Sequence, residues 1–315
     1  MVELTIIRQV FDEMLQREPD QREAAHYTGN FEGEYALRWQ LVNSAEYRER
    51  FDLPLPAHKY LDWPYAKLFI ASNIKVLYCP IAKNACTSLK RLMVDLSDID
   101  NKEKILGSQF HRATDLAVTG AQLKDLSTVQ ITEALESDEY LRFAVIREPL
   151  SRLLSAYWEK FVLNRCNQDV IAIDTGPTLA AIQQNEDFDP QRGISFSEFV
   201  HYVVDSDPEQ LNPHWKPQYT YLTGVNYNAF YDFAHMAPLF ETLAARSDRS
   251  IQVPEVNVTN SGSGKLVTAA SAMLPAELLT HGTIHIDSFY NVALKEMVAA
   301  YFEKDVALYN ACRAG

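Results

Sequence analysis

The sequence predicts an α/β protein with a mostly parallel central sheet, preceded by a small helical module. Two apolar runs of strand length, residues 74–79 and 141–146, are each followed by a short loop and then by apolar residues at helical spacing. Before residue 60 only helical spacing is found. The chain therefore divides into a helical module, residues 1–60, and a main α/β domain, residues 61–315.

The N-terminal module is predicted to contain two helices. Residues 2–16 place Val2, Ile6, Val10 and Met14 on one stripe, and the segment 17–20 ends that helix. A second helix is expected from about residue 34 to residue 51, before the turn-prone sequence Leu-Pro-Leu-Pro at 53–56.

Composition limits the classes of partner. The 315 residues carry 42 acidic and 29 basic side chains, a formal charge of -13, which argues against general nucleic-acid binding. The N-terminus lacks the pattern of a signal peptide and no stretch is long and apolar enough to span a bilayer, so we expect a cytoplasmic location. The four cysteines lack the spacing of a zinc site and are expected to be reduced, mostly buried thiols: Cys79, Cys86, Cys166 and Cys312.

The first strand-loop-helix unit has the features of an anion site. Its loop, residues 80–88, leads from the strand into a helix, so free backbone amides and the positive end of the helix dipole point at one place. Lys83 supplies a charge there, and Thr87 and Ser88 supply hydroxyl donors. A Walker A loop is excluded because the glycines are missing and Lys83 precedes Thr87 by four residues.

The second unit offers another cation at an equivalent place. Arg147 follows the strand at 141–146, and the next helix is expected to begin at Pro149 or Ser151. Ser155 lies one turn beyond Ser151, so Arg147 and Ser155 can converge on one anion.

Both units resemble motifs of the Golgi carbohydrate sulfotransferase family. Residues 78–93 (YCPIAKNACTSLKRLM) are similar to its 5'-phosphosulfate loop, with Ala82 and Leu89 as departures. Residues 143–161 (FAVIREPLSRLLSAYWEKF) are similar to its 3'-phosphate motif. Weaker similarity covers residues 212–218 (NPHWKPQ), 230–243, the Asn-x-Thr segment at 256–259 and a closing helix at 301–309. The N-terminal module resembles a short helical repeat appended to some bacterial surface-polysaccharide enzymes.

The resemblance implies a P-loop-like three-layer sandwich and a PAPS-dependent O-sulfotransferase, where PAPS is 3'-phosphoadenosine 5'-phosphosulfate. A sulfuryl group would pass to a hydroxyl of a carbohydrate or glycolipid, without a metal. The segment 164–193 is a candidate for acceptor contact. The residues expected to bind the donor are Lys83, Asn84, Ala85, Cys86, Thr87, Ser88, Arg147 and Ser155.

Two catalytic roles follow from this chemistry. Lys83 is expected to stabilise charge on the leaving oxygen, and His111, between the two motifs, to accept the hydroxyl proton. Glu159 and His214 are the alternative bases. A catalytically silent nucleotide- or glycan-binding module and an ATP-dependent phosphotransferase remain as other interpretations.

Overall fold

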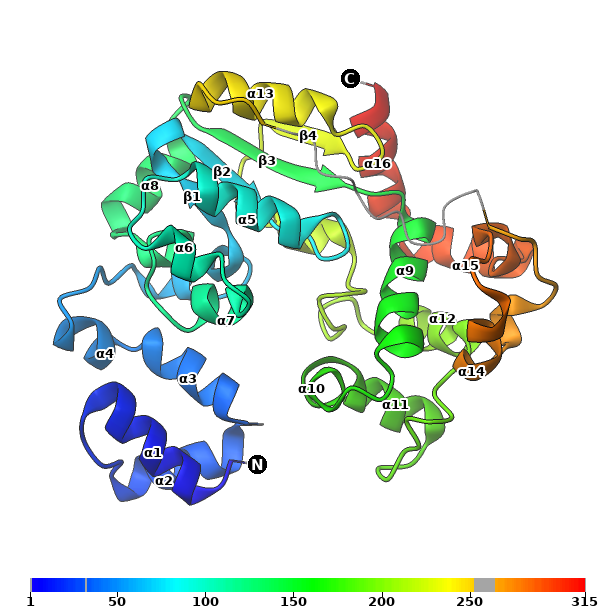
Figure 1. Cartoon of the computed structure of the whole chain (residues 1–315), viewed down its shortest axis with the longest axis horizontal. Coiled ribbons are helices and arrows are strands. Elements are labelled where there is room, and N and C mark those ends of the chain that lie inside the picture. The colour runs from blue at the N-terminus through cyan, green and yellow to red at the C-terminus, as the bar shows by residue number, and fades with distance from the viewer. Residues whose placement is uncertain (1, 32, 252–263, 315) are drawn as a thin grey trace. The chain divides into compact units, whose positions relative to one another are not determined.

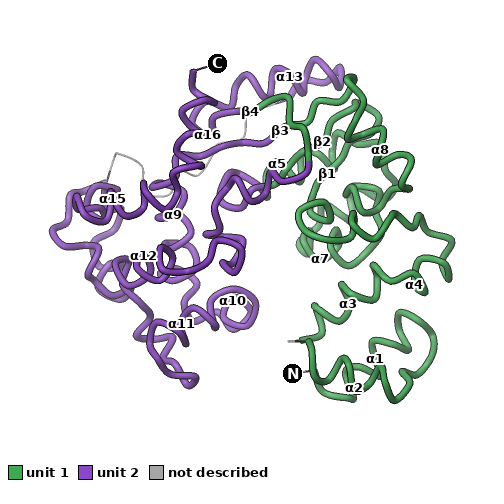
Figure 2. Tube along the Cα trace, turned by 180° about the vertical axis from the view of Figure 1, so that it is seen from behind, with its two compact units in different colours: residues 1–80, 87–143, 225–229 green, residues 81–86, 144–224, 230–315 purple. Residues whose placement is uncertain are grey.

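The computed structural model describes residues 2–31, 33–251 and 264–314. The predicted Asn-x-Thr segment at 256–259 lies outside them. The chain forms two compact units, which Figure 2 distinguishes by colour. The first contains residues 1–80, 87–143 and 225–229, and the second contains residues 81–86, 144–224 and 230–315.

Helices dominate the element order, which Figure 1 follows by colour. The described α-helices are α1 (Leu4–Leu15), α2 (Gln21–Asn30), α3 (Glu34–Val42), α4 (Ala45–Arg50), α5 (Cys86–Leu96), α6 (Lys102–Ile105), α7 (Phe110–Asp115), α8 (Thr128–Glu136), α9 (Pro149–Tyr157), α10 (Gln168–Val170), α11 (Gly176–Gln183), α12 (Phe196–Asp205), α13 (Ala237–Ser247), α14 (Pro275–Leu278), α15 (Val292–Tyr301) and α16 (Glu303–Ala314). A π-helix, η5 (Trp158–Leu163), continues α9, and a second one is η6 (Ile171–Thr175). The strands are β1 (Phe69–Ala71), β2 (Val76–Cys79), β3 (Leu141–Ile146) and β4 (Ala229–Asp232).

The four strands form one mixed sheet in the order β1-β2-β3-β4. β1 runs antiparallel to β2, with Phe69 opposite Tyr78. β4 runs parallel to β3, because Asn228 N–H donates to Arg142 O and Phe233 N–H donates to Ile146 O. The α/β class expected from the sequence is therefore confirmed.

The strands that carry the two motifs lie close to their predicted positions. β3 has the predicted bounds, and its six residues, Arg142 included, are all buried. β2 begins two residues late. Residues 72–74 form a 3-10 turn, and Lys75 has a left-handed backbone with φ of 53°.

The N-terminal helices differ from the prediction in two respects. The predicted helix at 2–16 is present as α1. The prediction of a single helix over 34–51 is wrong, because this segment forms two helices, α3 and α4. The helix α3 ends at Val42. The Ser44 hydroxyl then donates to Leu41 O and accepts from Tyr47 N–H, so that Ser44 caps α4. The helix α2 was not predicted because it is polar, although Asp20 and Glu23 form a capping box at its start.

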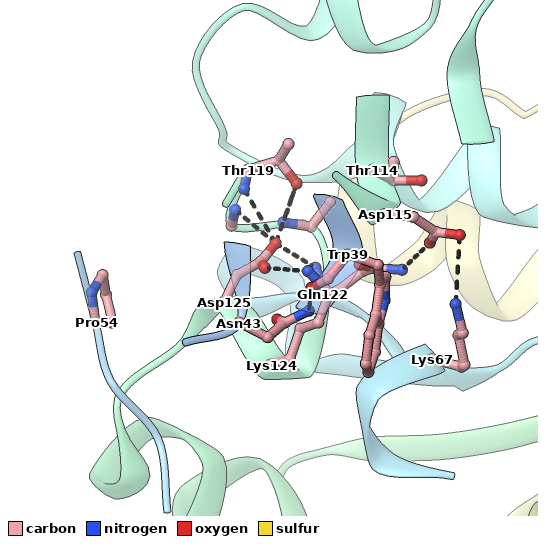
Figure 3. Close-up of polar contacts among 12 residues, drawn as sticks. Trp39, Asn43, Pro54, Lys67, Thr114, Asp115, Thr119, Gln122, Lys124 and Asp125 are labelled. Atoms are coloured by element: carbon pink, nitrogen blue, oxygen red, sulfur yellow. Dashed lines mark hydrogen bonds and ion pairs between the residues drawn. The ribbon is translucent and has the colours of Figure 1, made fainter. Parts of the chain in front are cut away.

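A buried arginine of α4, Arg48, bonds to a loop at Lys124, which is 76 residues further along the chain. The fully buried Arg48 guanidinium donates to Pro54 O, Lys124 O and Asn43 Oδ1. In the same loop the Asp125 carboxylate accepts from the backbone amides of residues 119, 120 and 122 and contacts the Lys124 amine, as Figure 3 shows for Thr119 and Lys124. These bonds fix the N-terminal helices within the unit.

The second unit has an aromatic core. Tyr157 on α9 and Phe161 on η5 pack against Phe199 on α12, and Phe161 also contacts the buried Trp215. This packing holds α9, the helix that follows Arg147, in one orientation.

The prediction for the four cysteines, that they are reduced and mostly buried thiols, is only partly confirmed. All four are free thiols, but the prediction that they are mostly buried is wrong, because Cys79 alone is buried and Cys166 is exposed. Burial raises the pKa of the Cys79 thiol to about 12. Within the ranges that the structure describes, no helix combines the length and apolarity that crossing a bilayer requires.

Replacing Arg48 by methionine should destabilise the protein. The change leaves three buried acceptors without their charged donor, and we expect the free energy of unfolding to fall by about 3 kcal/mol in urea titrations. Arg50→Met, two residues along the same helix, removes only an exposed contact with Gln16. Equal losses in the two variants would contradict a special role for Arg48.

Candidate active site

The loop between β2 and α5 adopts an unusual backbone conformation without glycine. Lys83 and Ala85 have φ values of 70° and 58°. The left-handed region costs an L-residue roughly 1–2 kcal/mol. Alternation of such residues with right-handed ones turns successive backbone amides toward one point, which is a common anion-binding arrangement. Contacts elsewhere must hold the loop in this shape.

The Asn84 side chain holds the loop in this conformation. Its side chain is fully buried, and its amide nitrogen donates to Val145 O at 2.7 Å and to Gln218 Oε1 at 2.6 Å. The side chain therefore faces the protein and anchors the loop to β3. The sequence predicted a donor contact for Asn84, and in this geometry only its backbone remains available for one.

Gln218 links the loop to the end of β3. Besides accepting from Asn84, its Oε1 accepts from Arg147 N–H at 3.0 Å, and its Nε2 donates to Arg147 O at 2.9 Å. The backbone of Gln218 is itself fixed, because its N–H donates to the buried Asp305 carboxylate at 2.7 Å. Within the second unit, one fully buried amide thus sets the positions of this loop and of the end of β3 relative to each other.

The side chain of Arg147 strengthens the same junction. Its Nη1 donates to Lys83 O at 2.8 Å and its Nε to Ser151 Oγ at 3.2 Å. The guanidinium lies 4.4 Å from the centre of the Phe233 ring. Burial, together with the charge of Arg152, lowers the pKa of Arg147 to about 10, so the group stays charged at neutral pH. The predicted partner Ser155 is buried one turn further along α9.

Arg152 belongs to the scaffold of the loop. It is almost fully buried and donates to three carbonyls, those of Ala82, Lys216 and Pro213. A second arginine thereby braces the loop from the side of α9.

The Lys83 amine contacts a carboxylate on η5. Its Nζ lies 3.2 Å from Glu159 Oε2, and the lysine side chain is only 16% exposed. Burial lowers the pKa of Lys83, while the Glu159 charge opposes that change. The predicted catalytic cation is therefore a largely desolvated ammonium group held by one acid.

Of the remaining predicted residues of the first motif, Thr87 and Ser88 lie in the first unit and Cys86 lies in the second. Thr87 and Ser88 are exposed in the first turn of α5, and Thr87 Oγ1 is 3.4 Å from His111 Nε2 on α7. Two other cations in the sequence around the first motif have other contacts: Lys75 pairs with Glu133, and Arg91 donates to the carbonyls of Leu106 and Gly107.

The alternative base His214 has fixed partners. Its Nδ1 lies 2.9 Å from Asn212 Oδ1 and 3.3 Å from Asp174 Oδ1. Asp174 in turn contacts Lys160 Nζ at 2.7 Å. Together these residues form a polar group that extends from the Trp215 segment to η5.

Similarity to known proteins agrees with this geometry. The profile described as the sulfotransferase family matches residues 66–310, more than three quarters of the chain. The chain belongs to the sulfotransferase family. This assignment confirms the resemblance that the two motifs indicated.

Several sulfotransferase relatives are known. Human carbohydrate sulfotransferase 14 is 32% identical over 180 residues, which cover 55% of this chain and 43% of the relative. Zebrafish (Danio rerio) carbohydrate sulfotransferase 14 is 34% identical over 152 residues, 48% of this chain and 40% of the relative. Mouse carbohydrate sulfotransferase 11 is 26% identical over 259 residues, 77% of this chain and 66% of the relative. The match to the first two thus spans less than half of their length, and no solved structure matches the chain.

Replacing Gln218 by leucine should destabilise the second unit. The change deprives Asn84 and both backbone groups of Arg147 of partners inside the protein, and we expect a loss of about 3 kcal/mol in the free energy of unfolding, measured in urea. Gln183→Leu is a matched control, because Gln183 also makes three loop hydrogen bonds but near the surface. If Gln218→Leu lost no more stability than the control, the junction would not depend on this amide.

Proposed function

We propose that the chain transfers a sulfuryl group from PAPS to a hydroxyl of a carbohydrate acceptor. The observation that carries the proposal is the junction of the two motifs, in which Arg147 Nη1 donates to Lys83 O and Gln218 bonds both segments. Two cations from separate strand-loop-helix units are thus held in one rigid group. Such a pair suits a ligand with two separate phosphates, as PAPS has at its 3' and 5' positions.

The roles of the residues follow from charge and hydrogen bonding. Lys83, with the backbone of Asn84, Ala85 and Cys86 and the hydroxyls of Thr87 and Ser88, would bind the 5'-phosphosulfate. Arg147 and Ser155 would bind the 3'-phosphate. The names of the relatives, which are carbohydrate sulfotransferases, support the acceptor class.

In the reaction, an acceptor hydroxyl oxygen forms a bond to sulfur while the bond from sulfur to the 5'-phosphate oxygen breaks. The electron pair of the broken bond stays on that phosphate oxygen. We propose that the Lys83 ammonium stabilises this charge and that His111 accepts the hydroxyl proton. The contact of His111 Nε2 with Thr87 Oγ1 at 3.4 Å, at the start of α5, supports the assignment of the base.

The finer predictions of architecture belong to this proposal. We propose a P-loop-like three-layer sandwich for residues 61–315 and an attached helical module for residues 1–60. A separate buried cluster in the N-terminal helices, which includes Ile7, Phe11 and Leu41, supports the module, and the family match begins only at residue 66. The cytoplasmic location stays a prediction.

Adenosine 3',5'-bisphosphate (PAP) and adenosine 5'-monophosphate (AMP) differ only in the 3'-phosphate, and they test the role of Arg147. We expect the wild-type protein to bind PAP more tightly than AMP in calorimetry. Arg147→Met should weaken PAP binding at least about tenfold, by loss of a charged hydrogen bond, and weaken AMP binding less.

Arg192→Met serves as the control, because Arg192 pairs with Glu198 at the surface of the same unit. Equal affinity of the wild-type protein for PAP and AMP would contradict the donor assignment. Transfer of labelled sulfate from PAPS to oligosaccharides, compared with peptide and phenol acceptors, tests the acceptor class in the same preparations.

A further inference from the structure

The Lys83 amine lies in a place where a lysine is difficult to keep charged. Its side chain is 16% exposed, and the Arg147 guanidinium, which holds the Lys83 carbonyl, adds a like charge nearby. Desolvation and a neighbouring cation both favour the neutral amine. A neutral amine would bind a phosphate poorly and would not stabilise a leaving oxygen.

Glu159 is placed to oppose this effect. Its Oε2 contacts Lys83 Nζ at 3.2 Å, and its other oxygen, Oε1, lies 3.5 Å from Lys160 Nζ. Lys160 is itself buried and held by Asp174 at 2.7 Å. The carboxylate is therefore clamped on both sides, rather than being a mobile surface acid.

The local backbone also supports a functional role. α9 ends at Tyr157, and the next turn, η5, is a π-helix that contains both Glu159 and Lys160. π-turns inserted in helices are rare and occur frequently at functional sites. This turn changes the direction in which Glu159 leaves the helix relative to a continued α-helix.

We propose that Glu159 is a positioning residue that keeps the Lys83 ammonium charged and oriented for the donor, with Lys160 and Asp174 fixing the carboxylate. The inference rests on the proposed function, since it assigns Lys83 to the donor. Three groups act on Lys83: Glu159 and Cys86 favour the charged amine, and Arg147 opposes it. Burial lowers the pKa of Lys83, so removal of the Glu159 charge should lower it further.

The pH dependence of PAP binding tests the proposal. Affinity is expected to fall as pH rises through the pKa of Lys83 in the free protein. In Glu159→Gln, which keeps the shape and removes the charge, the midpoint of that fall should lie at least about one pH unit lower than in the wild-type protein. A midpoint unchanged from the wild-type protein would overturn the proposal.

Glu209→Gln is the matched control. Glu209 also pairs with a buried lysine, Lys216, at 3.3 Å in the same unit, and its backbone carbonyl retains a bond to that amine. The midpoint of the fall in PAP affinity should be the same in Glu209→Gln as in the wild-type protein. An equal shift in Glu209→Gln and Glu159→Gln would show a general charge effect and overturn the specific role.

A second measurement needs no nucleotide. The ¹³Cε resonance of Lys83, assigned by its loss in Lys83→Arg, should titrate at lower pH in Glu159→Gln than in the wild-type protein. If the wild-type protein fails to bind PAP, the proposed function is wrong, whereas this titration still decides whether Glu159 controls the lysine. An unshifted titration with intact PAP binding would refute the role of Glu159 alone.

Discussion

The three hydrogen bonds made by the Gln218 side chain determine the geometry of the site. Through them the loop before α5 and the end of β3 share one buried amide. Either segment alone would be a short loop with a cation. Joined by Gln218, and braced by Arg152, they form a fixed arrangement that exists before any ligand binds, and such preorganisation reduces the entropy lost on binding.

The same junction explains how a loop without glycine holds a left-handed backbone at Lys83 and Ala85. The conformational cost is offset by the bonds of Asn84 and by the donation from Arg147 to Lys83 O. The interior position of the Lys83 amine follows from this backbone. A buried amine then requires a nearby carboxylate, and Glu159 is in contact with it. The functional charges thus depend on the scaffold that holds the loop.

The sequence allowed prediction of those elements that are determined by local residue patterns. The run at 141–146 is apolar except for Arg142, so β3 was located correctly, and the helix after it begins at Pro149, one of the two predicted starts. The α2 helix was missed because its composition is polar and its capping box is a weaker signal than periodicity. The break at Ser44 depends on a side-chain cap that apolar spacing does not reveal.

The long-range parts of the site could not be predicted in this way. Gln218 was noted only as the last residue of a motif, because the sequence gives no indication of its contact with Asn84, which is 134 residues away. Glu159 was named as a possible base from its position in the second motif. Its contact with Lys83 joins residues 76 apart in the sequence, and it lies on the π-turn η5, which spacing rules for an α-helix do not anticipate.

A crystal structure of the protein with PAP would test the central claim most directly. The predicted result is one nucleotide with its 5'-phosphate at Lys83 and its 3'-phosphate at Arg147, and with the Gln218 hydrogen bonds unchanged. A nucleotide bound away from both cations, or bound only after Gln218 had released Asn84 and Arg147, would contradict a preformed site.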